Sequence, residues 1–464
     1  MIKKITLVLC ALVALLIFGV VMLCLWLNQQ APKEIEAAKQ RLHEMGAPMT
    51  LEEALLLAVP DEKNAAPLYL ELVDFSEKTS AVAEADDLLE QQVFGEYYDK
   101  DWEYILRFEL RDEEWGVLEE AVEMLEQVGY FERIEAITVC SYFRPDWDFE
   151  QGPAMLIPEI TPAREAGRWC LARAFLRMRA NQPVAALADL KGAYVLSDQM
   201  AQGQTLINAL ISCAIRLMAN KSLETMSREG YDLSMLDSSV WDFSMMSHWL
   251  PALDLERLGM GRVVFETLLY GSDEERMTLL QGESRAMHTI GTLGLIRWFF
   301  EYDYATYLNL MADVRGQVGF SPAELKAADA ELQEQMLEAK RNYRILTCIL
   351  MPTTYHVQMR MTQCEARDRL AQTGLALSAY HAEHNSYPHS LSDLVPSYLS
   401  ELQLDPFSEA PLVYQWLEGG YQLYSVGVNG LDEGGVERVD ADIDEGDLIW
   451  TGAGSVLKRI DLLQ

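Results

Sequence analysis

The most chemically suggestive stretch of the chain is an acidic loop near its C-terminus. Eight carboxylates fall within sixteen residues: Asp432, Glu433, Glu437, Asp440, Asp442, Asp444, Glu445 and Asp447. Gly430, Gly434 and Gly435 lie before and among them and let backbone carbonyls turn inward. Crowded oxygen ligands suit a hard cation, and calcium would relieve the repulsion between the carboxylates. Asp432 and Asp440 are candidate ligands on density alone. The alternative is a solvated acidic turn.

Outside this loop, the densest group of metal-ligand side chains is His381, Glu383, His384 and His389. His381 and His384 are three residues apart on a predicted helix, a spacing that allows them to share a metal. His384, however, continues an apolar stripe that begins at Ala366, and such a stripe is typical of a packed helix face. We therefore favour packing over metal binding for these histidines.

No motif of a common catalytic site occurs in the sequence. It has no G-x-x-x-x-G-K-[ST] phosphate loop, no H-E-x-x-H zinc motif and no G-x-S-x-G nucleophile turn. Gly259-Met-Gly261 lacks the third small residue and the preceding strand of a dinucleotide-binding fingerprint, and it predicts a helix break. Acidic pairs such as Glu113 and Glu114 are typical of solvated helix faces. We predict that the protein is not an enzyme, and an unrecognised active site in the helical body is the alternative.

The N-terminal region predicts a membrane anchor. Residues 5–27 form an uncharged, apolar run of 23 residues, which as a helix is about 35 Å long and exceeds the ~30 Å hydrocarbon core of a bilayer. Lys3 and Lys4 precede the run, so the positive-inside rule places the N-terminus in the cytoplasm. A cleaved signal peptide is the alternative, but no small-x-small cleavage site follows Leu25. We expect a single-pass protein of the inner cell membrane with its bulk extracytoplasmic, in the periplasm.

The composition and net charge of the chain limit its class and its partners. Half of the residues are hydrophobic and 23% are charged, which predicts a folded chain rather than a disordered one. The 72 acidic and 37 basic residues give a net charge of −35, and beyond Lys4 the charge is −37. A field of this sign repels phosphate backbones, so nucleic acid is excluded as a partner. The cysteines show no C-x-x-C spacing and are expected to be buried as small apolar residues.

Residues 29–350 predict a helical body. Thr50 with Glu53, and Ser321 with Glu324, fit the capping box that starts a helix. Three helices are expected over 166–180, 185–200 and 205–227, separated by a turn at 181–183 and a break at Gly203. They resemble stacked antiparallel helix pairs, but no second copy of this unit recurs at a fixed period. The pattern therefore indicates a helical-hairpin array and not a regular repeat protein.

The last 110 residues change in character. A helix over 359–383 ends before Pro388, a short helical turn covers 390–395, and strands at 412–416 and 421–426 flank a turn at 418–420. The order helix, Tyr-Pro, Leu-x-x-Leu, Asp-Pro, Gly-Tyr-x-Leu-Tyr-Ser-x-Gly-x-Asn-Gly, Gly-Gly, Asp-Ile and Trp over residues 366–450 resembles the C-terminal domain of the major pseudopilin of type II secretion. A similar module occurs in membrane-anchored bacterial envelope proteins.

This resemblance implies a calcium ion in the final loop. By motif position Asn429 matches an aspartate ligand of that family, and Asp442 matches the aspartate of its Asp-Ile pair. Together with Asp432 and Asp440 they make up the predicted metal site. The family's cleavage site and early glutamate are absent, because no acidic residue occurs within residues 1–33. Assembly into a pseudopilus is therefore not expected, although contact with a secretion apparatus is an alternative.

The sequence thus predicts a mainly α protein of three parts. Residues 1–28 are a cytoplasmic tip and transmembrane helix, 29–350 an α-helical hairpin-array body, and 355–464 a pseudopilin-like α+β module with a long helix and a small antiparallel sheet. We expect an anchored structural or interaction protein stabilised by calcium. Its expected partners are the membrane, through residues 5–27, and other proteins of the cell envelope.

Overall fold

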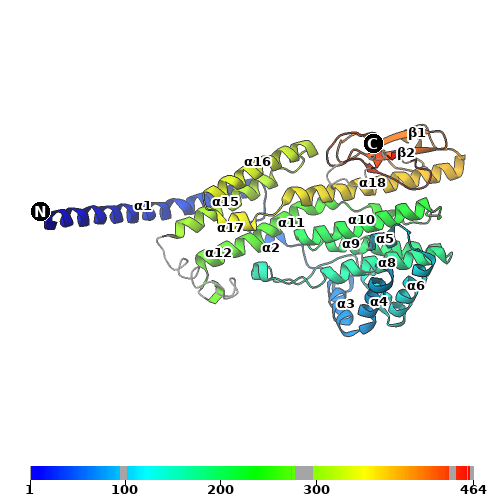
Figure 1. The fold of residues 1–464 in the computed structure, drawn as a ribbon, viewed down its shortest axis with the longest axis horizontal. Coiled ribbons are helices and arrows are strands. Elements are labelled where there is room, and N and C mark those ends of the chain that lie inside the picture. The colour runs from blue at the N-terminus through cyan, green and yellow to red at the C-terminus, as the bar shows by residue number, and fades with distance from the viewer. Residues whose placement is uncertain are drawn as a thin grey trace.

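The computed structural model describes residues 2–94, 102–272, 274–276, 296–437, 446–456 and 458–459. The protein is mainly α, with an apolar N-terminal helix and a small sheet near the C-terminus, as predicted (Figure 1). Asp440 and Asp442 of the predicted metal site lie outside the described residues.

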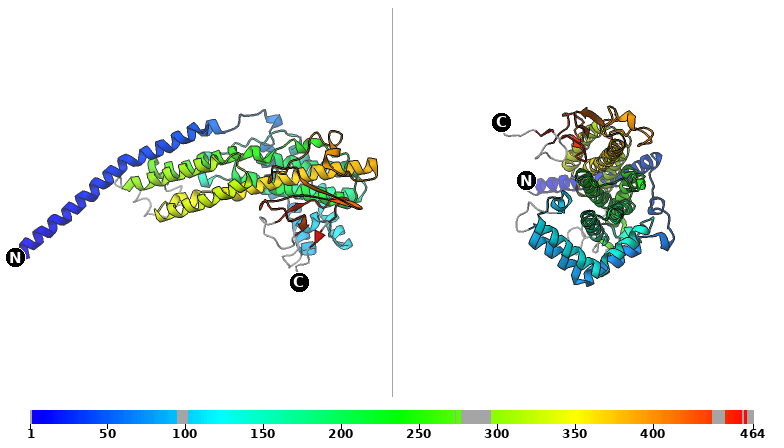
Figure 2. Two further views of the ribbon diagram at one scale, coloured as in Figure 1. Left: turned by 90° about the horizontal axis from the view of Figure 1, so that it is seen from above. Right: turned by 90° about the vertical axis from the view of Figure 1, so that its right-hand side faces the viewer.

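Helix α1 (Ile2–Glu44) is one continuous helix of 43 residues. Among the described residues it is the one helix long and apolar enough to cross a membrane, and its apolar window has no buried residue. Its second half is different, because Ala31, Ile35 and Leu42 are buried in the body. Figure 2 shows the first half of α1 projecting from the rest of the molecule. The predicted transmembrane segment and the first segment buried in the body therefore belong to one continuous helix.

The second half of α1 packs against α15 (Arg297–Arg315). The chain then turns back through α16 (Pro322–Arg341) and α17 (Ile345–Leu350). The capping box predicted at Ser321 is present, with Ser321 Oγ accepting from Glu324 N and Glu324 Oε2 accepting from Ser321 N. At the other predicted capping box, Thr50 Oγ1 accepts from Glu53 N, but the helix it starts, α2 (Leu51–Ala54), is one turn long.

The centre of the body is a stack of three antiparallel helices, α8 (Ile160–Arg179), α9 (Pro183–Ala201) and α10 (Leu206–Arg228). Helices α9 and α10 confirm the second and third helices expected from the sequence to within two residues, and α8 confirms the first but begins six residues earlier than expected. The described part of the body also contains α3 (Ala66–Lys78), α4 (Ser80–Leu89), α5 (Trp102–Leu106), α6 (Asp112–Gln127), α7 (Tyr130–Val139), α11 (Trp249–Leu255) and α12 (Val263–Tyr270), with short turns at Asp61–Lys63, Phe149–Ala154, Ser238–Trp241 and Met245–His248.

In the described part of the body, a π-helical segment extends α4 at Glu90–Phe94 and another joins α11 to α12 at Glu256–Arg262. The second contains Gly259 and Gly261, where the sequence predicted a helix break. That prediction was wrong: the helix continues from α11 into α12, and the glycines serve close packing instead. A Cβ on Gly261 would overlap the ring of Tyr307, and a Cβ on Gly259 would press on Phe149.

The C-terminal module contains α18 (Thr354–His384), a turn at Leu391–Leu394 and two small sheets. Strands β1 (Val413–Leu417), β2 (Gly420–Ser425) and β4 (Leu448–Ile449) form an antiparallel sheet in the order β1-β2-β4. The two-residue turn of the β1–β2 hairpin has Gly419 at φ 90°, a conformation that favours glycine. Strands β3 (Val436–Glu437) and β5 (Lys458–Arg459) pair in parallel.

Helix α18 joins the module to the body. Val357 and Met361 belong to a hydrophobic cluster that includes α1, α11 and α15. Leu370 and Leu377 belong to a second cluster, which extends from α3 through α8, α9 and α10 to the sheet. Met359 joins a third, smaller cluster with residues of the loops next to β2. Figures 1 and 2 show the sheet, α18, α10 and α9 stacked in that order. The module therefore shares its core with the body.

Candidate functional site

The first half of the acidic loop is a tight turn held by side-chain hydrogen bonds. Asn429 Oδ1 accepts from Leu431 N at 2.9 Å, and its Nδ2 donates to Glu433 Oε1 at 2.7 Å. Asp432 Oδ1 accepts from Tyr424 OH at 2.9 Å and from Gly434 N at 2.8 Å. Two residues of the predicted metal site, Asn429 and Asp432, thus shape the same turn.

Asp447 closes the loop from its other end. Its Oδ2 accepts from Gly435 N at 2.7 Å and its Oδ1 from Glu433 N at 3.4 Å. Burial raises the pKa of Asp447 to about 6 against these hydrogen bonds, and the charges of Glu433 and Asp432 add to the rise. The negative charges of Glu433 and Asp432 therefore disfavour the ionised form of Asp447, and a bound cation would relieve this repulsion.

The described half of the loop does not by itself complete a metal site. Among the described residues no group of three His, Cys, Asp or Glu side chains is arranged to hold a metal ion. Asp432 and Asp447 keep free lone pairs beyond their hydrogen bonds, since each carboxylate oxygen accepts twice. Hard oxygen donors of this kind are the ligands that calcium prefers. The donor chemistry of the loop fits calcium, and the ligand set stays a prediction.

A buried aspartate that sequence reasoning did not single out holds the base of the loop. Asp405 accepts from Ser425 Oγ at 2.8 Å, from Val426 N at 2.9 Å and from Phe407 N at 3.0 Å. Its side chain therefore ties the segment before β1 to the end of β2, where the acidic loop begins. The Asp-Pro pair at 405–406 was part of the family resemblance and was the available signal for this role.

The last described loop of the module is attached directly to α10. Thr451 N donates to the buried carboxylate of Glu224, and Ala453 N donates to Ser227 Oγ at 3.1 Å. Burial alone would raise the pKa of Glu224, but Lys221, Arg367 and the amide of Thr451 outweigh it and lower the pKa below its ordinary value. Glu224 is therefore a charged, buried clamp between body and module.

A second clamp is built around a fully buried arginine. Arg216 on α10 contacts Asp368 Oδ2 on α18 at 2.5 Å, Asp198 Oδ1 on α9 at 2.7 Å and the carbonyl of Val240 at 2.7 Å. Asn220 Nδ2 donates to Asp368 Oδ1 at 2.7 Å. One cation and two carboxylates thus link three helices, and they form a structural network rather than a free catalytic group.

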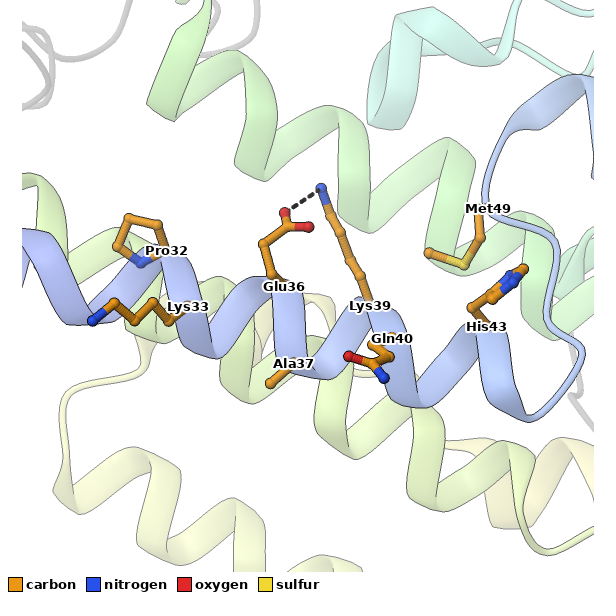
Figure 3. A pocket seen from close by; sticks show the side chains of 8 residues that line it. All are labelled: Pro32, Lys33, Glu36, Ala37, Lys39, Gln40, His43 and Met49. Carbon is orange, nitrogen blue, oxygen red and sulfur yellow. Dashed lines mark ion pairs between the residues drawn. The ribbon is translucent and has the colours of Figure 1, made fainter.

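One hollow of the surface lies along α1 and another lies beside α18. A groove of about 750 Å³ follows α1 and is lined by Pro32, Lys33, Glu36, Ala37, Lys39, Gln40, His43 and Met49. In Figure 3 Lys39 extends from α1 toward Glu36, and the two ions are 3.9 Å apart. A smaller pocket of about 240 Å³ beside α18 holds Asp242, Glu365 and Asp368. Glu365 there accepts from Ser244 Oγ and Met246 N.

The histidines of the module do not converge. His381 stacks on Tyr387, with ring centroids 4.4 Å apart. His384 lies against Tyr380 and is 3.2 Å from Tyr398 OH, and His389 packs beside Trp416. Each histidine has its own aromatic neighbour, but His384 and His389 are exposed, so His384 does not lie on a packed helix face as expected from the sequence.

Comparisons of the whole chain with protein-family models, with curated proteins and with solved structures found no match.

Proposed function

We propose that this protein is a single-pass, membrane-anchored structural and interaction protein whose helical body and C-terminal module lie outside the cytoplasm. The observation that carries the proposal is the continuity of α1. The helix has an exposed apolar half of membrane-spanning length and a second half buried in the folded body. An anchor of this kind holds the body at a fixed place on the membrane.

Orientation follows from the charge distribution. Lys3 and Lys4 precede the apolar run, and the rest of the chain carries a charge of −37. The positive-inside rule then places the N-terminus in the cytoplasm and the body in the periplasm, at the inner membrane.

The orientation can be tested by labelling intact cells. In a chain whose Cys10, Cys24 and Cys348 are replaced by alanine, Leu57→Cys introduces a thiol at a side chain that is 88% exposed. A membrane-impermeant maleimide is expected to label this variant in cells whose outer membrane has been permeabilised, with the inner membrane intact. Ala172→Cys, at a buried site, is the control for specific labelling. Labelling of Leu57→Cys only after the inner membrane is lysed would contradict the proposed orientation.

We propose protein partners in the cell envelope because the described part of the body consists of packed helices joined by structural ion networks. The resemblance of residues 366–450 to pseudopilin domains favours a component of a secretion apparatus as the second candidate. A photocrosslinker at Trp416, which is exposed on β1, separates the two. Recovery of pseudopilins would support the second candidate, and their consistent absence in an actively secreting strain would exclude it.

We also propose that calcium binds the acidic loop. Of the predicted ligands Asn429, Asp432, Asp440 and Asp442, the first two lie in the turn that faces Asp447. Calcium at millimolar concentration is expected to raise the melting temperature of the detergent-solubilised full chain, because a ligand that binds only the folded state stabilises it. Asp432→Asn should reduce this shift, and Glu331→Gln, at an exposed position of α16, should leave it unchanged. An equal shift in both variants, or none in the native chain, would exclude the site.

A further inference from the structure

The packing of α1 fixes how far the body lies from the bilayer. The apolar run ends at Leu27, and the next residue, Asn28, accepts a hydrogen bond through Oδ1 from Trp298 N at 2.8 Å. A helix rises 1.5 Å per residue. The first turn of α15 therefore lies about one residue beyond the end of the hydrocarbon span.

The two helices then run in parallel away from this level. Farther along α1, Arg41 pairs with Asp313 at 2.6 Å, and Arg315 Nη2 donates to the carbonyl of Gly46 at 3.1 Å. Contacts near residue 28 thus match the start of α15, and contacts near residue 46 match its end. The membrane-proximal end of the body is therefore the end that contains Trp298 and its neighbours.

The corner between α16 and α17 lies at the same level. Arg344 Nη1 donates to the carbonyl of Phe299 at 3.4 Å. Leu346 N and Thr347 N donate to the buried carboxylate of Asp303 at 3.0 and 3.1 Å, which holds the start of α17 beside the second turn of α15. Figure 1 shows α17 beside α15 at the end of the body where α1 enters.

This corner exposes apolar side chains that nothing in the described chain covers. Tyr343, Ile345 and Ile349 are 71%, 57% and 71% exposed. Ile345 and Ile349 are four residues apart on one face of α17, while Leu346 and Thr347 on the other face are buried. Surfaces of this kind mark interaction sites.

The charge of the corner is opposite to that of the protein as a whole. Residues 336–350 contain Lys340, Arg341 and Arg344 and a single acid, Glu338, in a chain with a net charge of −35. Basic groups beside exposed Tyr and Ile side chains suit anionic headgroups above an apolar core. Trp26, 55% exposed at the end of the apolar run of α1, adds an aromatic anchor at this depth.

We propose that the membrane-facing corner, defined as Tyr343, Ile345 and Ile349, inserts into the headgroup region of the bilayer that α1 spans. The headgroup layer is roughly 5 to 7 Å thick on each side. Asp303, which holds the start of α17, is five residues, or about 7.5 Å, beyond Trp298, so the corner begins at the outer edge of this layer. Lipid is the occupant because the position of Asn28 on α1 places the corner there. The proposal rests on the proposed membrane anchoring.

The test uses the full chain in vesicles of phosphatidylcholine and phosphatidylglycerol, with Cys10, Cys24 and Cys348 replaced by alanine. An environment-sensitive fluorophore is attached to Tyr343→Cys or Ile349→Cys. The matched control is Val184→Cys, because Val184 is 62% exposed. Val184 lies at the start of α9, and the other end of α9 leads to Gln204, which contacts α2. The label at position 184 is therefore about 28 Å farther along the body than α2 is.

We expect labels at positions 343 and 349 to show blue-shifted emission and severalfold stronger quenching by lipid-borne quenchers than the label at position 184. Emission typical of water at both positions, in protein that alkaline carbonate does not extract from the vesicles, would overturn the corner proposal and leave the membrane anchor supported. Release of the protein by carbonate would contradict the proposed membrane anchor itself. Blue-shifted emission without lipid quenching would show that protein covers the corner, and this too would overturn the proposal.

Discussion

Replacing Arg216 with methionine should destabilise the junction between body and module strongly. The guanidinium is fully buried and contacts Asp368, Asp198 and the carbonyl of Val240. Methionine has a similar length but no charge, so the change removes the cation and leaves most of the volume filled. Two carboxylates would then face each other without a counter-ion.

The size of the loss in unfolding free energy depends on the hydrogen bonds and solvent exposure that the two carboxylates keep. Breaking a buried ion pair by removing one partner costs about 3 to 5 kcal/mol. Asp368 would keep the hydrogen bond from Asn220, and Asp198 is partly exposed, so the lower part of this range applies. We therefore expect the free energy of unfolding of Arg216→Met to fall by about 3 kcal/mol at pH 8.

The loss should depend on pH. Burial raises the pKa of Asp198 to about 7 and also raises that of Asp368, although Arg216 opposes both shifts. Without Arg216 both folded-state pKa values rise further above those of the unfolded chain. The folded variant then binds more protons than the unfolded one, so its stability falls as pH rises through this range. The deficit of Arg216→Met should be smaller at pH 5 than at pH 8.

Urea titration of the detergent-solubilised full chain, followed by tryptophan fluorescence at both pH values, measures this deficit. Lys78→Met is the matched control, because Lys78 pairs with Asp74 at the same 2.5 Å but on the surface. Its loss should be below about 1 kcal/mol. Adding Asp198→Asn to Arg216→Met should recover part of the stability. Equal losses in the buried and surface variants, or a deficit that does not grow with pH, would refute the reasoning.

Three further predictions concern the module. Gly374→Ala should lower the free energy of unfolding by about 1 to 3 kcal/mol, because its Cβ would overlap the indole of Trp450; calorimetry should show no loss for Gly116→Ala, which has open space. Glu224→Gln should reduce the loss of stability that the native chain shows at acidic pH. Burial opposes ionisation of Glu224, but nearby cations lower its pKa in the folded state. The stabilisation by its charge is therefore present above pH 4.5 and lost as pH falls. Asp447→Asn should stabilise the calcium-free chain at pH 8 and weaken its melting-temperature response to calcium; destabilisation without calcium would contradict the repulsion described above.

Local patterns predicted the parts of the fold that local physics determines. The helices over α8, α9 and α10 were found because Pro183, Gly203 and apolar periodicity are signals within one helix pair. The hairpin at Gly419 was found because its turn requires a positive φ. The break expected at Gly259 failed because glycine marks both helix ends and close packing, and the ring of Tyr307 that requires the space lies 46 residues away from Gly261.

The clamps between body and module could not be predicted from sequence. Arg216 and Asp368 are 152 residues apart, and Glu224 and Thr451 are 227 apart. In the sequence each is an ordinary charged or polar residue on a helix or loop, and only the tertiary fold buries them together. The acidic loop was visible because its carboxylates are neighbours in the chain. Asp405, which holds its base, was recognised only as part of a motif because its partners come from β2.

The same helix geometry fixes where a partner of the module must be. Helix α18 has 31 residues and is about 46 Å long. Figures 1 and 2 show it running along the body, away from the end where α1 enters, with the β1–β2 hairpin packed near its far end. The contacts of Arg216 and Glu224 hold the module against α10, so it cannot tilt back toward the bilayer without breaking buried charge pairs. If α1 spans the membrane as proposed, a protein that crosslinks to Trp416 must itself extend on the order of tens of ångströms from that membrane.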